Sequence, residues 1–267
     1  MSHRRVVLSL VAVLCAIAGV AFAPGADARA ARPAAFSKLF AAKADDASLN
    51  WAGYYRLAKP GEKITEVSGT TYAPKLKLLP PTQAAAWVGI GGATTSDLIQ
   101  AGVAFGRVDG YYAWFERLPE PIRPITSGCV GDNTCRVAQG DRIDVHIKHL
   151  GNDTWRIYVT NVNKWSWSMD TPYNSSFSSA EWILEAPIYS LNAAPFVPIF
   201  TTPANIAHAR FFSNRYVVNG QARVLKQNEA TRTHVSPVGV PRVSTASDVR
   251  GDSAFQVCPY KQNCPKP

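Results

Sequence analysis

Two stretches of this 267-residue sequence place polar side chains among apolar ones, where acid–base chemistry is possible. In residues 180–187 the two-residue period of a strand puts Glu181 and Glu185 on one face, with Ile183 between them. Four residues of strand span about 13 Å, so the two carboxyl groups cannot share one proton. A carboxyl group among apolar neighbours is partly desolvated, which raises its pKa and suits a general acid or base. A surface glutamate paired with Lys or Arg explains the segment equally well.

The second stretch, residues 98–104, carries a single amide. Strand periodicity places Leu98, Gln100, Gly102 and Ala104 on one face. The small residues beside Gln100 leave room for another group to approach the amide. A glutamine that is hydrogen-bonded within a sheet is the alternative, and this segment taken alone favours it.

Most familiar catalytic motifs are absent, since the sequence contains no G-x-S-x-G, H-E-x-x-H or P-loop pattern. Residues 89–92 are rich in glycine, but no helical pattern follows them. His146 and His149 would point to opposite faces of a strand, which argues against a shared metal ion. We therefore expect no metal and no other cofactor. A Ser/His/Asp triad assembled from distant segments is left open.

The elements that must position these residues are predicted to be strands. Apolar and polar residues alternate in 142–150, 155–162 and 165–169, which is typical of antiparallel strands with one buried face. Asp109-Gly110 and Asn219-Gly220 are hairpin turn sequences. No long amphipathic helix is predicted after residue 50. The pattern predicts an all-β protein, an antiparallel β-sandwich of two sheets.

Composition and charge narrow the class of protein. Hydrophobic residues make up 46% and charged residues 18%, as in globular proteins, which excludes wholesale disorder. The net charge is +9, and it falls to +7 if residues 1–30 are removed. The Lys and Arg residues are spread over strands and loops rather than gathered in a run, so we expect no nucleic-acid partner.

The amino terminus has the pattern of a secretion signal. Arg4 and Arg5 precede an apolar run that ends near two small-x-small sites, within residues 21–28. We predict a signal peptide over 1–30, a linker or remnant pro-segment over 31–48 and one domain over 49–267. The protein is then secreted, with no stable membrane association once the signal is cleaved. An uncleaved membrane anchor is the alternative.

Four cysteines remain after the predicted cleavage. They form two C-x5-C pairs, and an even number in an exported chain indicates disulfides. The spacing favours local bridges, Cys129 with Cys135 and Cys258 with Cys264. Zinc is the alternative, although zinc sites usually have closer cysteine spacing.

A series of short motifs resembles the glutamic peptidases, the eqolisin or G1 family. The motifs occur in the same order and at similar spacing over residues 50–187, about half of the chain. They are Asn50-Trp51-Ala52-Gly53, Ala86-Trp87-Val88-Gly89-Ile90-Gly91-Gly92, Leu98-Ile99-Gln100-Ala101-Gly102, Tyr112-Ala113-Trp114-Phe115-Glu116, Gly140-Asp141-Arg142-Ile143 and Ala180-Glu181-Trp182-Ile183-Leu184-Glu185. Each motif is weak alone, but six in order are fairly specific.

The resemblance implies a fold and a catalytic pair. The family fold is a concanavalin-like sandwich of two antiparallel sheets, bent to form a substrate groove. Its catalytic Gln corresponds to Gln100, and its catalytic Glu is the second one of the A-E-[WF]-I-x-E strand, hence Glu185. Family members cleave peptide bonds in acidic surroundings without a metal. We therefore expect a monomeric endopeptidase that acts on peptide or protein substrates.

The resemblance also assigns Trp51, Trp87 and Glu116 to the substrate groove; core packing is the alternative for each. A two-residue hairpin loop would place Glu116 opposite Val103, whereas a three-residue Val-Asp-Gly loop would place it opposite Gly102, on the face of the catalytic amide. We favour the longer loop.

Two positions depart from the family pattern. Acidic residues of the family are replaced by Gly91 and Ala104, which leaves the pH optimum open. Two other functions remain: a carbohydrate-active sandwich with Glu116 and Glu185 as a glycosidase pair, and a catalytically silent binding domain.

Overall fold

The computed structural model describes residues 45–48, 50–75, 83–106, 110–185, 188–190, 198–200, 209–235 and 244–259. The chain divides into two units, 1–32 and 33–267, and every described residue belongs to the second. The predicted signal peptide and most of the predicted linker lie outside the described residues. Apart from one turn of 3-10 helix, Gln227–Glu229, the regular elements described are all strands.

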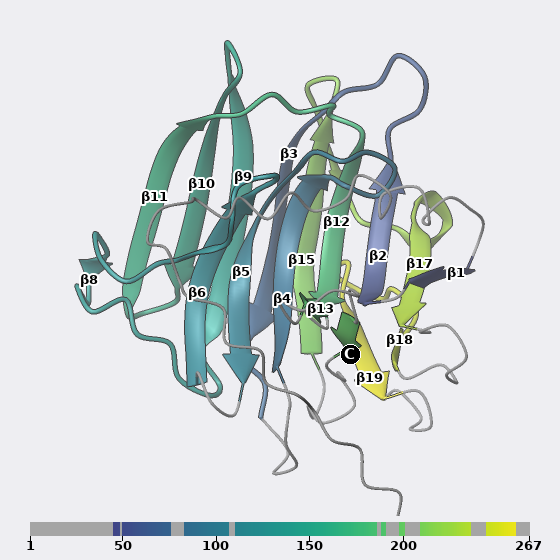
Figure 1. The fold of residues 1–267 in the computed structure, drawn as a ribbon. Helices are drawn as coiled ribbons and strands as arrows, with labels where there is room; N and C mark the ends of the chain where they lie inside the picture. Colours follow the sequence, from purple (N-terminus) through teal and green to yellow (C-terminus); the bar gives the residue numbers. More distant parts are fainter. Residues whose placement is uncertain are drawn as a thin grey trace, which may run out of the picture. The chain divides into compact units, whose positions relative to one another are not determined.

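One layer of strands carries all the sequence motifs discussed above except Gly140-Asp141-Arg142-Ile143 (Figure 1). Its strands, in the order in which they pair, are β7 (Arg123–Pro124), β6 (Gly110–Arg117), β5 (Leu98–Gly106), β4 (Gln83–Gly91), β12 (Ser179–Glu185), β2 (Trp51–Leu57) and β17 (Thr231–Val235). All of these pairs are antiparallel; the short strand β1 (Asp45–Ser48) then adds to β17 in parallel. The antiparallel pairing fixes which residues stand opposite each other.

A second layer packs against the first. Its strands, in the order in which they pair, are β8 (Val130–Gly131), β11 (Trp165–Pro172), β10 (Thr154–Asn161), β9 (Arg142–Gly151), β3 (Ile64–Tyr72) and β15 (Ala209–Val218). The strand β15 also pairs with β16 (Gln221–Val224) and β19 (Phe255–Pro259). The strand β18 (Ser244–Ala246) pairs with both β17 and β19. The two layers are thereby joined at one edge into a single network of 17 strands, with β13 (Ile188–Ser190) and β14 (Pro198–Phe200) pairing separately.

The main core lies between the layers because side chains alternate along each strand. Ala86, Val88 and Ile90 of β4 belong to this core, together with Trp155 and Ile157 of β10. A smaller cluster occupies the opposite face of the first layer and includes Ala85, Trp87, Leu98, Ala104, Trp114 and Ile183. Every residue of β5 is buried, because both of its faces are covered. The candidate site shares this second face.

The structure confirms the all-β prediction and the main strand assignments. The segments 142–150 and 155–162 correspond to β9 and β10, and their predicted inward residues are buried. Asn219 and Gly220 form the two-residue turn between β15 and β16, both with positive φ. The strands β5 and β6 that flank the predicted Asp109-Gly110 turn pair with each other, with Gly106 opposite Gly110, and residues 107–109 lie outside the described residues.

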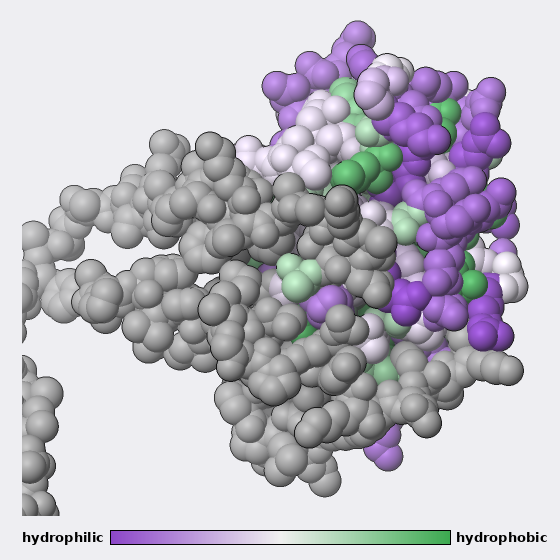
Figure 2. Space-filling model, turned by 90° about the vertical axis from the view of Figure 1, so that its right-hand side faces the viewer, coloured by the Kyte–Doolittle hydropathy of each residue, from purple (hydrophilic) through white to green (hydrophobic). Residues whose placement is uncertain are grey.

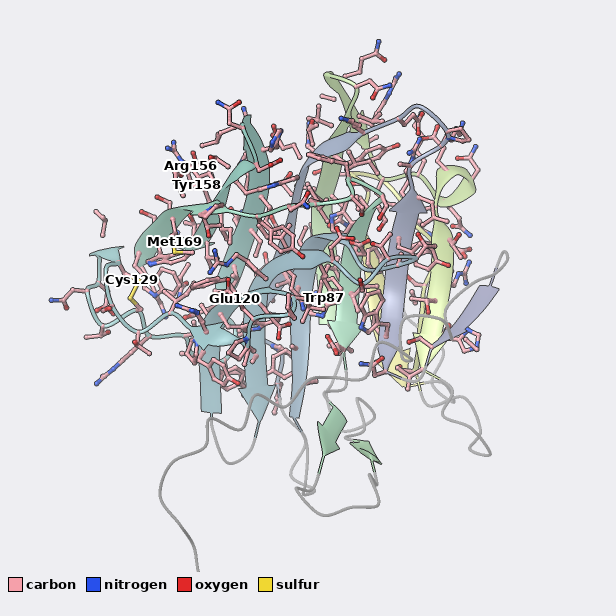
Figure 3. All side chains as sticks on the ribbon, turned by 45° about the horizontal axis from the view of Figure 1, so that its top comes forward. Trp87, Glu120, Cys129, Arg156, Tyr158 and Met169 are labelled. Atoms are coloured by element: carbon pink, nitrogen blue, oxygen red, sulfur yellow. A yellow bond between two sulfur atoms is a disulfide. The ribbon has the colours of Figure 1, made fainter. Side chains whose placement is uncertain are left out.

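One of the two predicted disulfides is confirmed, and one cysteine of the other is disulfide-bonded. Cys129 and Cys135 form a disulfide in the loop that carries β8; Cys129 is labelled in Figure 3. Cys258 on β19 is disulfide-bonded as well, and Cys264 lies outside the described residues. Among the described residues no helix is long and apolar enough to span a bilayer. Where described residues are visible in Figure 2, their surface is mainly hydrophilic with scattered apolar side chains.

Candidate active site

Three rows of side chains cross the second face of the first layer, from β6 through β5, β4 and β12 to β2. The first row contains Glu116, Gln100, Gly89, Glu181 and Tyr55. The middle row contains Trp114, Gly102, Trp87, Ile183 and Gly53. The third row contains Tyr112, Ala104, Ala85, Glu185 and Trp51. All five predicted site residues therefore lie on one face.

Gln100 is held in the first row by its neighbour on β6. Its side chain is only 3% exposed, and its Nε2 donates a hydrogen bond of 2.6 Å to Glu116 Oε2. Its Oε1 is buried and has no hydrogen-bond partner among the described residues. Because an amide oxygen has two lone pairs, Gln100 retains an acceptor that a water molecule would satisfy.

The register of Glu116 differs from both hairpins considered from the sequence. Glu116 stands directly opposite Gln100, because Gly106 pairs with Gly110 and the loop is residues 107–109. The predicted face is confirmed, and the predicted partner, Gly102, is wrong by two residues. The loop contains three residues, as favoured, but begins one residue earlier than the Val-Asp-Gly sequence suggested.

Glu185, in the third row, accepts hydrogen bonds from two side chains, one just before β2 and one on β4. Asn50 Nδ2 donates to Glu185 Oε1 at 2.8 Å, and Trp87 Nε1 donates to Glu185 Oε2 at 2.9 Å. The Ser48 hydroxyl accepts hydrogen bonds from the backbone N–H groups of Asn50 and Trp51, which fixes the turn that presents Asn50. Asn50 belongs to the first of the six family motifs, but no local pattern predicted that it would bind Glu185.

The indole of Trp87 connects the two rows that carry Gln100 and Glu185. Its Nε1 lies against Glu185, and its Cζ3 lies 3.0 Å from the position that a Cβ on Gly89 would occupy, in the row of Gln100. The ring of Trp51 packs edge-on against Trp87 at a centroid distance of 5.0 Å (Figure 3 labels Trp87 on β4). Gln100 and Glu185 are four residues apart in register, so Trp87 spans the interval between them.

Glu181 is a residue of this face that the sequence prediction left without a role. It lies in the row of Gln100, and its side chain is 0% exposed. Desolvation by burial raises the pKa of Glu181 well above its usual value; Ser179 opposes this shift and Asp97 adds to it. Burial therefore favours the neutral form of its carboxyl group.

An acidic residue is present beside one of the two positions that depart from the family pattern. The Asp97 carboxylate lies 2.8 Å from where a Cβ on Gly91 would be, and φ at Gly91 is +86°, a conformation that favours glycine. The backbone N–H of Ser176 donates to Asp97 at 2.7 Å. Asp97 thus places a carboxylate next to position 91.

The described part of the chain contains no group of three or more His, Cys, Asp and Glu side chains that could hold a metal ion.

Comparison with known proteins gives a match to one family model, which covers residues 49–258 and describes the Peptidase A4 family. The chain belongs to the Peptidase A4 family. This confirms the resemblance to the eqolisin peptidases and the predicted enzyme class.

Solved structures of this family have the same fold. One is a Scytalido-glutamic peptidase with a peptide-based transition-state analogue, at 18% identity and a TM-score of 0.65; the match covers 79% of this chain and 98% of that one. Another is SCP-B, a member of the eqolisin family in complex with the tripeptide Ala-Ile-His, at 17% identity and a TM-score of 0.62, with the same coverage. No curated protein matches the sequence.

Proposed function

We propose that this protein is a secreted glutamic endopeptidase in which Gln100 and Glu185 act on one water molecule at acidic pH. The observation that carries the proposal is that both side chains lie on one face of the first layer, each held by a neighbour. The peptide-based ligands of the two similar structures are consistent with a peptide substrate.

The proposed reaction uses one carboxylate as a base and then as an acid. Ionised Glu185 takes a proton from a water whose hydroxide attacks the scissile carbonyl carbon. One Nε2 hydrogen of Gln100 is engaged by Glu116, and the other donates to the developing oxyanion; such a preorganised donor is typically worth about 3 kcal/mol. Glu185 then gives its proton to the leaving amine.

Glu185 suits the role of base better than Glu181. It accepts two N–H hydrogen bonds, which favour an ionised carboxylate, and it is partly exposed. Glu181 is fully buried, and burial raises the pKa of its carboxyl group, which favours the protonated form. A neutral carboxyl group cannot take a proton from water.

The glycosidase alternative is not supported by the register. Glu116 lies three strands from Glu185 and Gln100 lies two strands from it, while the offset along the strands is four residues for both. Glu116 is therefore the more distant partner for the Glu185 carboxylate. Glu116 is also already hydrogen-bonded to Gln100.

The test is cleavage of denatured casein between pH 2 and pH 7 by the mature protein and three variants. We expect Glu185→Gln and Gln100→Ala to lose at least about a hundredfold in kcat/KM, because each removes a group that acts in the transition state. Glu181→Gln, a matched change on the same strand, should retain most activity. Cleavage that survives in both dyad variants, or loss confined to Glu181→Gln, would refute the assignment.

A further inference from the structure

A serine that precedes the first family motif fixes the turn that leads to Glu185. The Ser48 hydroxyl accepts hydrogen bonds from the backbone N–H groups of Asn50, at 3.3 Å, and of Trp51, at 2.9 Å. It also donates a long hydrogen bond of 3.5 Å to Asn50 Oδ1. The side chain of Ser48 is only 3% exposed, so these bonds are shielded from water. One hydroxyl group therefore holds both the backbone and the side chain of Asn50.

The amide of Asn50 has one favourable orientation between Ser48 and Glu185. An ionised carboxylate only accepts hydrogen bonds, so the amide must turn its Nδ2 toward it, and Nδ2 donates to Glu185 Oε1 at 2.8 Å. The Ser48 hydroxyl favours the same orientation, because it offers its proton to Oδ1 on the other side of the amide. A continuous series of hydrogen bonds thus joins Ser48 to the candidate base.

The position of Ser48 is set by strand pairing. Ser48 is the last residue of β1, which lies parallel to β17 with Ser48 opposite Val235 (Figure 1). The strand β17 pairs with β2, and β2 pairs with β12, which carries Glu185. The residues that match the family model begin at 49, one residue after β1 ends. Ser48 therefore contacts the candidate site from outside the matched region.

We propose that Ser48 is a positioning residue for Glu185: it holds Asn50 so that the amide of Asn50 orients the carboxylate toward the reacting water. The inference rests on the proposed function, because it names residues that support the base of that reaction. It extends the active site into β1, which lies in the segment 31–48 predicted as a linker or pro-segment. A maturation cut that leaves an active enzyme then falls before Asp45, since a later cut removes part of β1.

Variants that remove only a hydroxyl or an amide test these contacts. Ser48→Ala should lower kcat about tenfold, and Asn50→Leu about ten- to a hundredfold, with KM little changed, since small misplacements of a catalytic group have effects of this size. Ser48→Thr keeps the hydroxyl and should retain kcat within a few-fold. The control is Thr70→Val, which removes a buried hydroxyl that donates to Asp144 at 2.7 Å in the second layer, and it should leave kcat unchanged.

The double variant Ser48→Ala/Asn50→Leu shows whether Ser48 acts through Asn50. Without the amide, the hydroxyl has no group to position, so the double variant should be no slower than Asn50→Leu alone. Losses that multiply in the double variant would overturn the proposal. A Ser48→Ala variant with the kcat of the parent would overturn it as well, and so would equal losses in Ser48→Ala and Thr70→Val.

A spectroscopic measurement decides the contact without proteolysis. In a heteronuclear NMR spectrum, the side-chain NH2 signals of Asn50 are identified by their absence in Asn50→Leu. They should move in Ser48→Ala and stay in place in Thr70→Val, and unchanged signals in Ser48→Ala overturn the proposal. If the parent protein cleaves no peptide, the proposed function fails, while these signals still decide whether Ser48 holds Asn50.

The amino terminus of the active protein tests the extension into β1. The protein purified from culture by its proteolytic activity should begin at or before Asp45 when its terminus is determined by mass spectrometry. An active form that begins after Ser48 overturns the proposal.

Discussion

Replacing Trp87 by phenylalanine would remove a hydrogen bond that holds the Glu185 carboxylate. The indole Nε1 donates to Glu185 Oε2 at 2.9 Å, and the ring is fully buried. Phenylalanine keeps an aromatic ring in the same place but has no donor. We expect the Glu185 carboxylate to be held less firmly, because the bond from Asn50 is to its other oxygen.

The expected effect follows from the strength of the lost bond. A hydrogen bond to a charged group contributes about 1.5–3 kcal/mol, and each 1.36 kcal/mol corresponds to a factor of ten in rate. If most of that free energy serves to orient the base, kcat falls about ten- to a hundredfold. KM should change little, because Trp87 Nε1 is already engaged by Glu185.

Trp114 provides a matched control for this substitution. It lies in the same row as Trp87, separated from it only by Gly102, and it is 2% exposed. Its Nε1 is buried without a partner among the described residues. Trp114→Phe therefore makes the same change of volume in the same cluster without removing a hydrogen bond. The cavity costs of the two substitutions should be similar.

The assay is steady-state cleavage of a fluorogenic peptide across the active pH range, with melting temperatures measured for both variants. A Trp87→Phe variant that keeps the kcat of the parent would refute the role of the indole in holding Glu185. Equal losses in Trp87→Phe and Trp114→Phe would assign the effect to packing instead.

Three further substitutions test the fold and its electrostatics. Gly53→Ala should destabilise the protein by about 3 kcal/mol or more in denaturant unfolding, because φ is +151° and the new Cβ would lie 2.1 Å from a backbone oxygen of β12; unchanged stability would contradict this register. The Arg56 hydrogen bond lowers the pKa of Glu62 to about 2, so this pair stabilises the fold above pH 4.5 and is lost as pH falls toward 2. Glu62→Gln should remove that part of the acid dependence of the melting temperature, and an unaltered curve would refute it. Ala104→Asp adds a carboxylate to the row of Glu185, which should move the acid limb of the pH–rate profile to higher pH; a shift to lower pH would contradict the assigned base.

The strands and their faces could be predicted from the sequence because side-chain alternation is local. The alternating residues of 142–150 and 155–162 gave the buried faces of β9 and β10, and the same period placed Gln100 and Glu185 on the face they occupy. The Asn219-Gly220 turn was also readable, since two adjacent residues with positive φ are a local requirement.

Which residues stand opposite one another was decided only by the tertiary structure, because strand register depends on loops and on packing of both faces. Glu116 paired with Gln100 through a loop that begins one residue earlier than expected. Asn50 reaches Glu185 because β2, which follows Asn50, pairs with β12, which carries Glu185. The sequence therefore determined the set of reactive side chains and their common face, whereas burial and register determined that Glu181 is enclosed beside Gln100 while Glu185 is held by donors.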